Sequence, residues 1–171
     1  MAQITETAIK EAAQKFLEGS TIKELKGITN QELEAVYSLA FNYYRTGKFD
    51  EAEKLFNFLA LFDHLNPKFW MGVGAVRQVK KDFSGAVQAY GYASFLDISN
   101  PKPQIHAAEC FLAMGDKRNA ASSLEALEHF CPKDTDLGRE YRAKAAELRK
   151  LVGEEAFVAL AKEDEKPEEN S

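Results

Sequence analysis

The 171-residue chain is 45% hydrophobic and 29% charged, with a formal net charge of -5 at pH 7, which suits one domain with its own core and argues against nucleic acid as a partner. Its apolar runs are far shorter than the roughly 20 residues of a bilayer helix, which argues against direct membrane insertion. Two cysteines cannot form a disulfide framework and the N-terminus lacks a signal-peptide pattern, so we expect a cytoplasmic protein.

The first predicted element is a helix over residues 4–17, where apolar side chains recur at helical spacing until Gly19. A short turn of helix over residues 22–25 is expected to follow it. Residues 1–30 therefore form an N-terminal helical segment, which is a candidate for dimerisation.

A pattern with a period of 34 residues begins in the next segment. Small residues recur every 34 residues in two sets. The first set is Ala40, Gly74 and Ala108, and the second is Ala52, Ala86 and Ala120. Bulky residues recur at Phe56, Tyr90 and Leu124. Such a period is typical of tetratricopeptide repeats, in which small residues let two helices approach and bulky ones fill the space between helix pairs. It predicts an all-α fold, with three repeats over residues 31–132 in a short right-handed superhelix.

The positions of glycine and proline residues predict where these helices begin and end. Helix pairs are expected at 31–46 and 50–64, at 67–80 and 84–98, and at 101–114 and 117–130. Gly47 and Gly115 lie at the turns inside the first and third repeats, where a positive φ ends a helix most easily, and Lys81 takes that place in the second. Pro67 and Pro101 are expected to open the next repeats.

Residues 133–162, after Pro132, are expected to cap the exposed end of the repeats. One amphipathic helix carries a single apolar stripe, made by Leu137, Tyr141, Ala145, Leu148 and Leu151. A further helical piece is expected over residues 154–161. Residues 163–171 hold five acids against Lys166, which predicts a solvated, disordered tail.

The first helix of each pair lines the concave side of a tetratricopeptide stack, so its surplus residues are candidates for binding. They are Tyr37, Phe41, Tyr44 and Arg45 in the first repeat, Met71, Ala75 and Gln78 in the second, and Ile105, Glu109 and Leu112 in the third. His64, at a repeat boundary, is expected to cap a helix or to line the same groove.

Three of these candidates are aromatic and share one helix face, because they follow i, i+4, i+7 spacing at positions 37, 41 and 44. A plain core stripe is the alternative interpretation. The same helix already supplies other residues to the contacts between helices, namely Val36, Leu39, Ala40 and Tyr43. A second aromatic face then has no evident place to be buried, which favours an apolar binding groove.

The second helix of the first repeat carries more apolar residues than one stripe can hold, notably Phe58 and Phe62. Either the N-terminal helix packs over these two rings or a second subunit does. The sequence leaves both alternatives open.

No pattern in the sequence indicates catalysis, a metal site or a cofactor. His106 and Cys110 share a helix face at i, i+4, but no third ligand stands at compatible spacing, and Cys110 is expected to face a neighbouring helix. Gly72 and Gly74 are interpreted as small packing residues inside a helix, not as a phosphate-binding loop. The sequence favours a binding protein over an enzyme.

Three stretches of the chain resemble the class II chaperones of bacterial type III secretion. They are YSLAFNYYRTGKFDEA at residues 37–52, LFDH at 61–64 with FWMGVGAVRQ at 69–78, and HAAECFL at 106–112. The resemblance covers residues from about Phe16 to Phe130 and extends to positions that the repeat consensus leaves free. It implies a cytoplasmic chaperone that binds hydrophobic translocator proteins in a concave apolar groove and keeps them soluble and unassembled before export.

The resemblance also implies the mode of binding and the oligomeric state. The captured translocator segment is extended and of P-x-L-x-x-P type, and Tyr37, Phe41 and Tyr44 match the groove-lining aromatics of the first repeat. The family commonly dimerises through its N-terminal region and first repeat, which favours a homodimer contact at Phe58 and Phe62.

Two other binding functions are consistent with the repeats. One is a general tetratricopeptide scaffold or regulatory adaptor outside secretion. The other is an adaptor that clamps a C-terminal carboxylate, but aromatic rings at 37 and 41 stand where that clamp needs cationic and amide donors. The clamp is therefore disfavoured.

Overall fold

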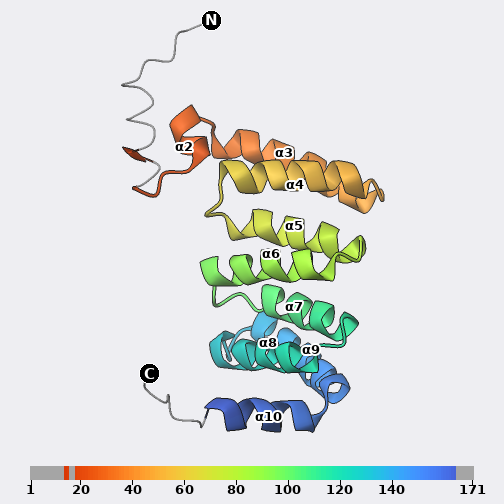
Figure 1. Ribbon diagram of the computed structural model, residues 1–171. Helices are drawn as coiled ribbons and strands as arrows, with labels where there is room; N and C mark the ends of the chain where they lie inside the picture. Colours follow the sequence, from red (N-terminus) through yellow and green to blue (C-terminus); the bar gives the residue numbers. More distant parts are fainter. Residues whose placement is uncertain (1–13, 16–17, 165–171) are drawn as a thin grey trace, which may run out of the picture. The chain divides into compact units, whose positions relative to one another are not determined.

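The computed structural model describes residues 14–15 and 18–164, and in that part of the chain every regular element is an α-helix (Figure 1). The helices are α2 (Ile22–Lys26), α3 (Asn30–Arg45), α4 (Phe49–Phe62), α5 (Pro67–Val79), α6 (Phe83–Leu96), α7 (Lys102–Ala113), α8 (Lys117–Phe130), α9 (Asp136–Val152) and α10 (Glu154–Asp164). The predicted all-α fold and the predicted helix pairs are confirmed. The helix expected over residues 4–17 falls almost entirely outside the described residues, and so does most of the acidic tail.

The chain divides into two compact units, Met1–Val73 and Gly74–Ser171, which we call the N-terminal unit and the C-terminal unit. The boundary falls inside α5. The first half of this helix is described with the N-terminal unit and the second half with the C-terminal unit.

Side chains at the helix starts hold the N-terminal unit's local structure. Thr21 and Glu24 form a capping box at α2, and Thr29 and Glu32 form another at α3. In each box the threonine hydroxyl accepts from the glutamate amide and the glutamate carboxylate accepts from the threonine amide, so two otherwise unpaired donors are satisfied. The α3 helix then turns back into α4, and the two lie antiparallel and side by side (Figure 1).

The core of the N-terminal unit forms where α3, α4 and the start of α5 meet. Ala40 and Ala52 have no exposed surface, and Phe56 is 2% exposed. Gly72 on α5 faces that ring, because a Cβ atom built on it would collide with the Phe56 side chain. The prediction that Gly72 is a packing residue inside a helix is confirmed.

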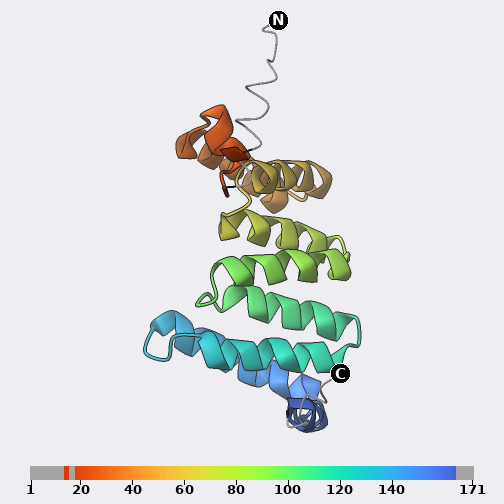
Figure 2. The ribbon, with the colours of Figure 1, turned by 60° about the vertical axis from the view of Figure 1, so that its left-hand side comes forward.

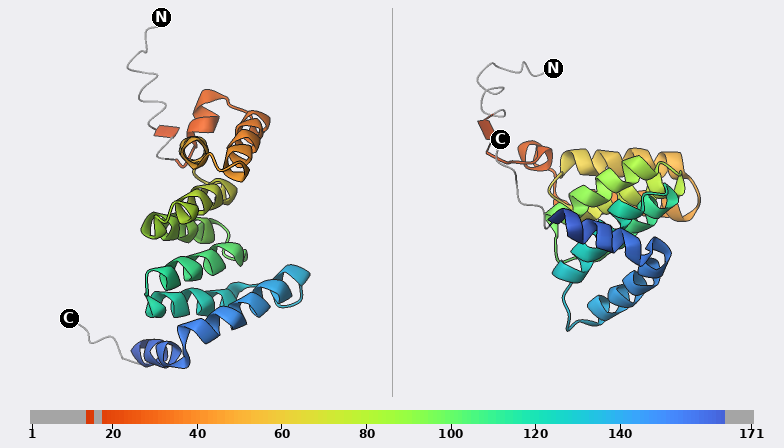
Figure 3. Two further views of the ribbon diagram at one scale, coloured as in Figure 1. Left: turned by 90° about the vertical axis from the view of Figure 1, so that its right-hand side faces the viewer. Right: turned by 60° about the horizontal axis from the view of Figure 1, so that its bottom comes forward.

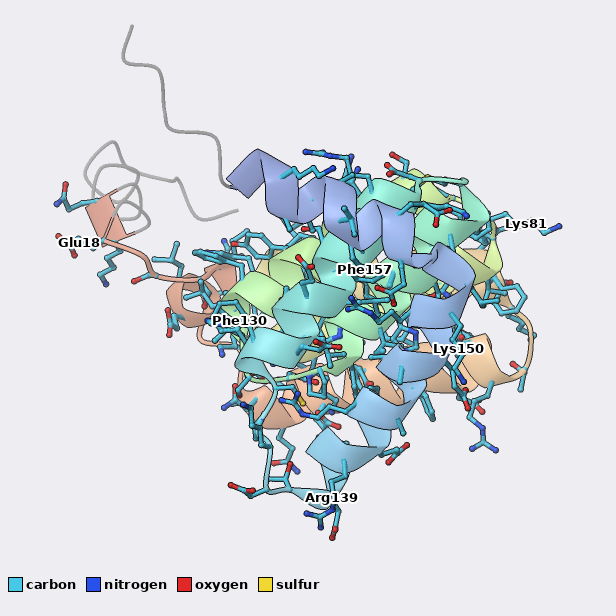
Figure 4. All side chains as sticks on the ribbon, turned by 90° about the horizontal axis from the view of Figure 1, so that it is seen from below. Glu18, Lys81, Phe130, Arg139, Lys150 and Phe157 are labelled. Atoms are coloured by element: carbon cyan, nitrogen blue, oxygen red, sulfur yellow. The ribbon has the colours of Figure 1, made fainter. Side chains whose placement is uncertain are left out.

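In the C-terminal unit, α7 packs against both α6 and α8, and α6 and α7 run side by side in Figure 2. Helices α9 and α10 follow α8 and pack onto it (Figure 3). An apolar core joins α7, α8, α9 and α10, and it contains Ile105, Ala108, Ala120, Ala121, Leu124, Leu127, Cys131, Ala145, Val152 and Phe157. Phe157, labelled on α10 in Figure 4, belongs to this core, and the Arg149 guanidinium lies 3.6 Å from its ring centroid.

Three equivalent turns end the first helix of each pair with a positive φ, as predicted. The angles are +78° at Gly47, +65° at Lys81 and +77° at Gly115. Pro67 is the first residue of α5, as expected. Pro101 instead lies just before α7, and Pro103 occupies the first turn of that helix.

Replacing Lys81 with glycine is expected to stabilise the protein by about 0.5–1 kcal/mol, because a residue with a Cβ atom is strained at a positive φ. Lys81 is exposed, and Figure 4 shows its side chain extending away from the helices, so the substitution removes little packing. Urea unfolding followed by circular dichroism measures the change. Lys80→Gly, one residue earlier and still exposed, is the control and should lower the stability. A Lys81→Gly protein with a lower unfolding free energy would contradict the strain argument.

Candidate functional site

An aromatic cluster on α3 is the main candidate site in the N-terminal unit. The rings of Tyr37 and Phe41 are nearly parallel, with an interplanar angle of 7° and centroids 6.3 Å apart. Phe41 is 45% exposed, although phenylalanine is usually buried in folded proteins. An exposed aromatic side chain beside a partly buried one offers apolar contact area to a partner.

Tyr37 is less accessible than the sequence suggested, because its ring also belongs to the core of the unit. It meets Phe56 edge-on at 5.7 Å and Phe69 at 6.1 Å between ring centroids. This burial raises the pKa of the Tyr37 phenol above its ordinary value, against the opposite influence of nearby Lys68. Tyr37 therefore combines a structural contact with a surface role.

The ring of Tyr37 is covered from one further direction by a charged side chain. Lys68 Nζ lies 3.8 Å from the Tyr37 ring centroid, a cation–π distance. The same ammonium donates to both carboxylate oxygens of Glu34, at 2.7 and 2.8 Å. Glu34 is on α3, one turn before Tyr37, and Lys68 is in the first turn of α5.

The remaining predicted residues of the N-terminal unit take varied positions. Tyr44 meets Phe49 edge-on at 5.9 Å, so its ring packs at the turn between α3 and α4. Arg45 is exposed and Met71 is half-buried. His64 lies in the turn between α4 and α5, where its carbonyl accepts a 2.8 Å hydrogen bond from the Trp70 indole.

A mostly buried ion pair also holds this turn. Lys23 on α2 donates to Asp63 at 2.6 Å, and the two side chains are only 16% and 9% exposed. The same lysine also donates to Asn30 at the start of α3. These groups line a pocket of about 350 Å³ with Leu33, Glu34, Leu65, Asn66, Pro67 and Phe69. The two partners are 40 residues apart in the sequence, so no local pattern indicates this pair.

In the C-terminal unit, the assignment of one residue to the groove is wrong. Ile105 has no exposed surface and lies in the core shared by α7 to α10. Helix α7 turns this side chain toward α8, so it has no surface to offer a ligand. Leu112 packs partly against the same core, and Ala75 is half-buried.

Gln78 and Glu109, also predicted for the groove, belong to a polar network that joins four helices. Tyr90 donates to the Gln78 side-chain oxygen at 2.7 Å, and the Gln78 amide donates to Glu109 at 3.2 Å. Lys144 of α9 donates to the second carboxylate oxygen of Glu109 at 2.8 Å. His106 Nδ1 lies 3.0 Å from Glu109 and its ring stacks on Tyr90, with centroids 5.3 Å apart.

These contacts hold the pKa of the Glu109 carboxyl at about 2, chiefly through the hydrogen bond with His106 and then through Lys144 and Gln78, against the opposing effect of burial. The carboxylate is thus fixed as an anion at neutral pH. The i, i+3 spacing of His106 and Glu109 could have indicated part of this network. Nothing in the sequence indicated Lys144.

Replacing Glu109 with glutamine is expected to lower the unfolding free energy at pH 7 by on the order of 1–2 kcal/mol. Because the folded pKa of about 2 lies below the ordinary 4.5, the carboxylate stabilises the fold above pH 4.5 and this contribution is lost as the pH falls toward 2. The difference between the two proteins should therefore shrink between these pH values. Urea unfolding at pH 7, 4.5 and 3 measures it, and two curves that stay parallel would refute the role of Glu109.

A second exposed apolar surface lies on α4, at the residues that the sequence singled out. The rings of Phe58 and Phe62 are 4.2 Å apart between centroids. Phe58 is 39% exposed and Leu61 is 60% exposed, so this face is open among the described residues. We call Phe58, Leu61 and Phe62 the α4 face.

The described residues contain no cluster of three or more histidine, cysteine or acidic side chains that could hold a metal. Cys110 is buried as predicted, and this burial raises the pKa of its thiol to about 11. Among the helices that the structure describes, none is both long and apolar enough to cross a bilayer.

Known proteins share both the repeats and the fold. A tetratricopeptide repeat family model matches residues 33–66 and 67–100. The low calcium response locus protein H of Yersinia pestis is 41% identical over 114 residues, which make up 66% of this chain and 68% of that protein.

Two solved structures from Yersinia enterocolitica are also similar. One is the type III secretion chaperone SycD in complex with a peptide of the translocator YopD. This SycD chain is 33% identical to the chain described here, with a TM-score of 0.68, and the match covers 73% of this chain and 95% of that chain. The other is an alternative dimer of the type III secretion translocator chaperone SycD, also 33% identical, with a TM-score of 0.67 and coverage of 73% and 94%. The chain described here belongs to this family, the class II chaperones of type III secretion.

Proposed function

We propose that this protein is a cytoplasmic chaperone of a type III secretion system, which binds hydrophobic translocator proteins and keeps them soluble and unassembled before export. The observation that carries the proposal is the aromatic pair on α3, in which Phe41 remains 45% exposed beside the ring of Tyr37. The SycD complex with a YopD peptide supports it, because a relative of the same fold binds a translocator segment.

The proposed mode of binding is capture of an extended segment of P-x-L-x-x-P type. An extended chain presents separated apolar side chains, which suit a surface of exposed rings better than a globular partner would. Translocators carry membrane-seeking segments that aggregate when they are exposed, so sheltering a short anchor has a clear use. Ordering a flexible segment costs entropy, and we expect moderate affinity and release without a covalent step.

We assign contact residues to each unit separately. In the N-terminal unit they are Phe41 and Tyr37, with Tyr44, Arg45, His64 and Met71 as further candidates. In the C-terminal unit they are Gln78 and Glu109, which carry polar groups able to meet a peptide backbone, together with Ala75 and Leu112. Binding of this kind needs no catalytic group, and we propose that the protein is not an enzyme.

Calorimetric titration of the whole protein with a synthetic P-x-L-x-x-P peptide tests this function. The control peptide carries alanine at the proline and leucine anchors. We expect micromolar binding of the first peptide and loss of binding with the second. Equal heats with both peptides, or none with either, would favour a tetratricopeptide scaffold with another kind of partner.

We also propose that the protein forms a homodimer through the α4 face. The closely spaced Phe58 and Phe62 rings and the exposed Leu61 make a contiguous apolar surface on one helix. A surface of this kind is commonly covered by a partner, and a second copy of the same chain is the simplest one. A dimer recorded for SycD supports this proposal. The alternative cover, the helix expected over residues 4–17, lies outside the described residues.

Replacing Phe62 with glutamate is expected to weaken dimerisation at least about tenfold, because a charge must then be buried in an apolar contact. Sedimentation velocity over a range of concentrations measures the dissociation constant. Leu61→Glu is a second variant with less risk to folding, since Leu61 is 60% exposed. Asn42→Glu, at an exposed polar position of α3, is the control. If the native protein and all three variants sediment identically, the α4 face is not part of a dimer interface.

A further inference from the structure

We propose that Lys68 is a gate on the Tyr37 ring: its ammonium covers the ring in the free protein and must leave before an apolar side chain of the cargo can pack there. The inference rests on the proposed function, since it concerns access to the same aromatic cluster. It makes Lys68 a residue that sets affinity and selectivity without belonging to the apolar surface itself.

The geometry of the gate is defined by contacts on two helices. Lys68 Nζ lies 3.8 Å from the Tyr37 ring centroid and pairs with both oxygens of Glu34. The Lys68 backbone is fixed as well, because its amide donates to the Asn66 side chain at 3.1 Å. The ammonium is therefore held over the ring by its contacts with the aromatic face and with the Glu34 carboxylate.

Three aromatic rings of the protein also contact the Tyr37 ring. Phe56 meets it edge-on, Phe69 is tilted against it, and Phe41 lies parallel to it. Lys68 has a long side chain that is 43% exposed, so its displacement opens a route by which a ligand side chain can reach the ring. Phe41 remains accessible without any movement, so the free protein offers one open aromatic contact and one covered by a cation.

The gate is easy to open, because neither interaction that holds it is strong. The Lys68 and Glu34 side chains are 43% and 56% exposed, and ion pairs at such positions are weak. Exposed cation–π contacts are also weak. Their combined loss corresponds to about a five- to tenfold change in an equilibrium constant.

Selectivity follows from what happens to the displaced ammonium. A cargo that brings a carboxylate next to its apolar anchor gives Lys68 a new partner, whereas one that brings a lysine or arginine repels it. Of two cargo segments with the same apolar anchors, the acidic one should bind more tightly.

Titration of the P-x-L-x-x-P peptide into Lys68→Met tests the gate. Methionine keeps an unbranched apolar stem of similar length and removes the charge, so the ion pair with Glu34 and the cation–π contact that hold the side chain over the ring are both lost. We expect an uncharged peptide to bind about five- to tenfold more tightly to Lys68→Met than to the native protein at low salt. The difference should narrow in high salt, which screens exposed ion pairs. Unchanged or weaker binding would overturn the proposal.

Lys102→Met is the matched control. Lys102 stands 34 residues after Lys68, follows the same Asn-Pro dipeptide and makes the same backbone hydrogen bond, to Asn100 at 3.1 Å. Its removal changes the net charge by the same amount and should leave the affinity unchanged. An equal gain in Lys102→Met would show a general charge effect and would also overturn the gate.

A spectroscopic measurement separates failure of the gate from failure of the proposed function. In the free protein the Lys68 methylene protons next to the ammonium should show upfield ring-current shifts, which Tyr37→Leu removes. Peptide saturation should return them to ordinary values. Native protein that shows no such shift refutes the gate whether or not any peptide binds, and a shift that persists in the saturated complex does the same. If the Lys68 methylene protons show the upfield shift but the protein binds no peptide, the proposed function is refuted instead.

Discussion

Alanine at position 74 is expected to destabilise the C-terminal unit by about 2–4 kcal/mol, although glycine to alanine normally favours a helix. A Cβ atom on this residue would lie 2.5 Å from Tyr90 Cε1, inside any acceptable contact distance. Tyr90 is 1% exposed, so its ring has no free space to move into. Its hydroxyl also donates to Gln78 and its ring stacks on His106, so a displaced ring would disturb the network around Glu109 as well.

The control for this prediction is Gly91→Ala on α6. Apart from its chain neighbours and the backbone of its own helix, no atom lies within 4 Å of a Cβ built there, so the substitution should stabilise the protein by about 0.5–1 kcal/mol through helix propensity. Guanidinium unfolding followed by far-ultraviolet circular dichroism measures both variants against the native chain. The prediction requires opposite signs at positions 74 and 91. Two stabilising substitutions would show that the contact with Tyr90 is looser than the structure indicates.

The sequence was sufficient to predict the helices because each repeat meets the same packing constraint. A small residue at the closest approach of two helices is needed once per repeat, and Ala40, Gly74 and Ala108 supply it at a fixed interval. The turn that follows needs a positive φ, which glycine adopts freely, and the periodicity located even the exception at Lys81. A repeated physical requirement leaves a repeated pattern that can be recognised without homologues.

Which side chains are exposed could be predicted less well, because exposure depends on helices outside the repeat. Leu39 was expected between helices and is 45% exposed, whereas Ile105 was expected on the groove and is completely buried. The burial of Ile105 arises from a core shared with α8, α9 and α10. Helices α9 and α10 lie beyond the repeat, so its period carries no information about their position.

The polar contacts of the candidate site were the least predictable part. Lys144 reaches Glu109 from 35 residues further along the chain, and Lys68 reaches Glu34 from the next repeat. Single long side chains make these contacts, and no periodic pattern marks a charge that has a partner on another helix. Local spacing can indicate only pairs on one helix, such as His106 and Glu109.

The double use of Tyr37 changes how the aromatic surface should be tested. Truncating its ring would remove contacts with Phe56 and Phe69 in the core, so a loss of binding in Tyr37→Ala could reflect a loosened unit. Tyr44→Ala would be ambiguous for the same reason, because the Tyr44 ring packs against Phe49. Phe41 has the largest exposed fraction of the three predicted aromatics and is the cleaner probe.

Phe41→Ala is expected to weaken peptide binding about 30-fold, equivalent to about 2 kcal/mol, because exposed aromatic anchors dominate interfaces of this kind. Its unfolding free energy should change by less than about 1 kcal/mol, since the removed ring is half in solvent. Titration calorimetry and urea unfolding on the same preparation separate the two effects.

Leu39→Ala provides a control with the same starting exposure on the same helix, since Leu39 and Phe41 are both 45% exposed. Two residues along an α-helix turn the side chain by about 200°, so Leu39 lies on a different face of α3. Its truncation removes a comparable exposed apolar group and should leave peptide affinity unchanged. If both variants lose affinity equally, binding depends on the general hydrophobicity of α3. If Phe41→Ala alone loses it, the partner is recognised by the face that Phe41 shares with Tyr37.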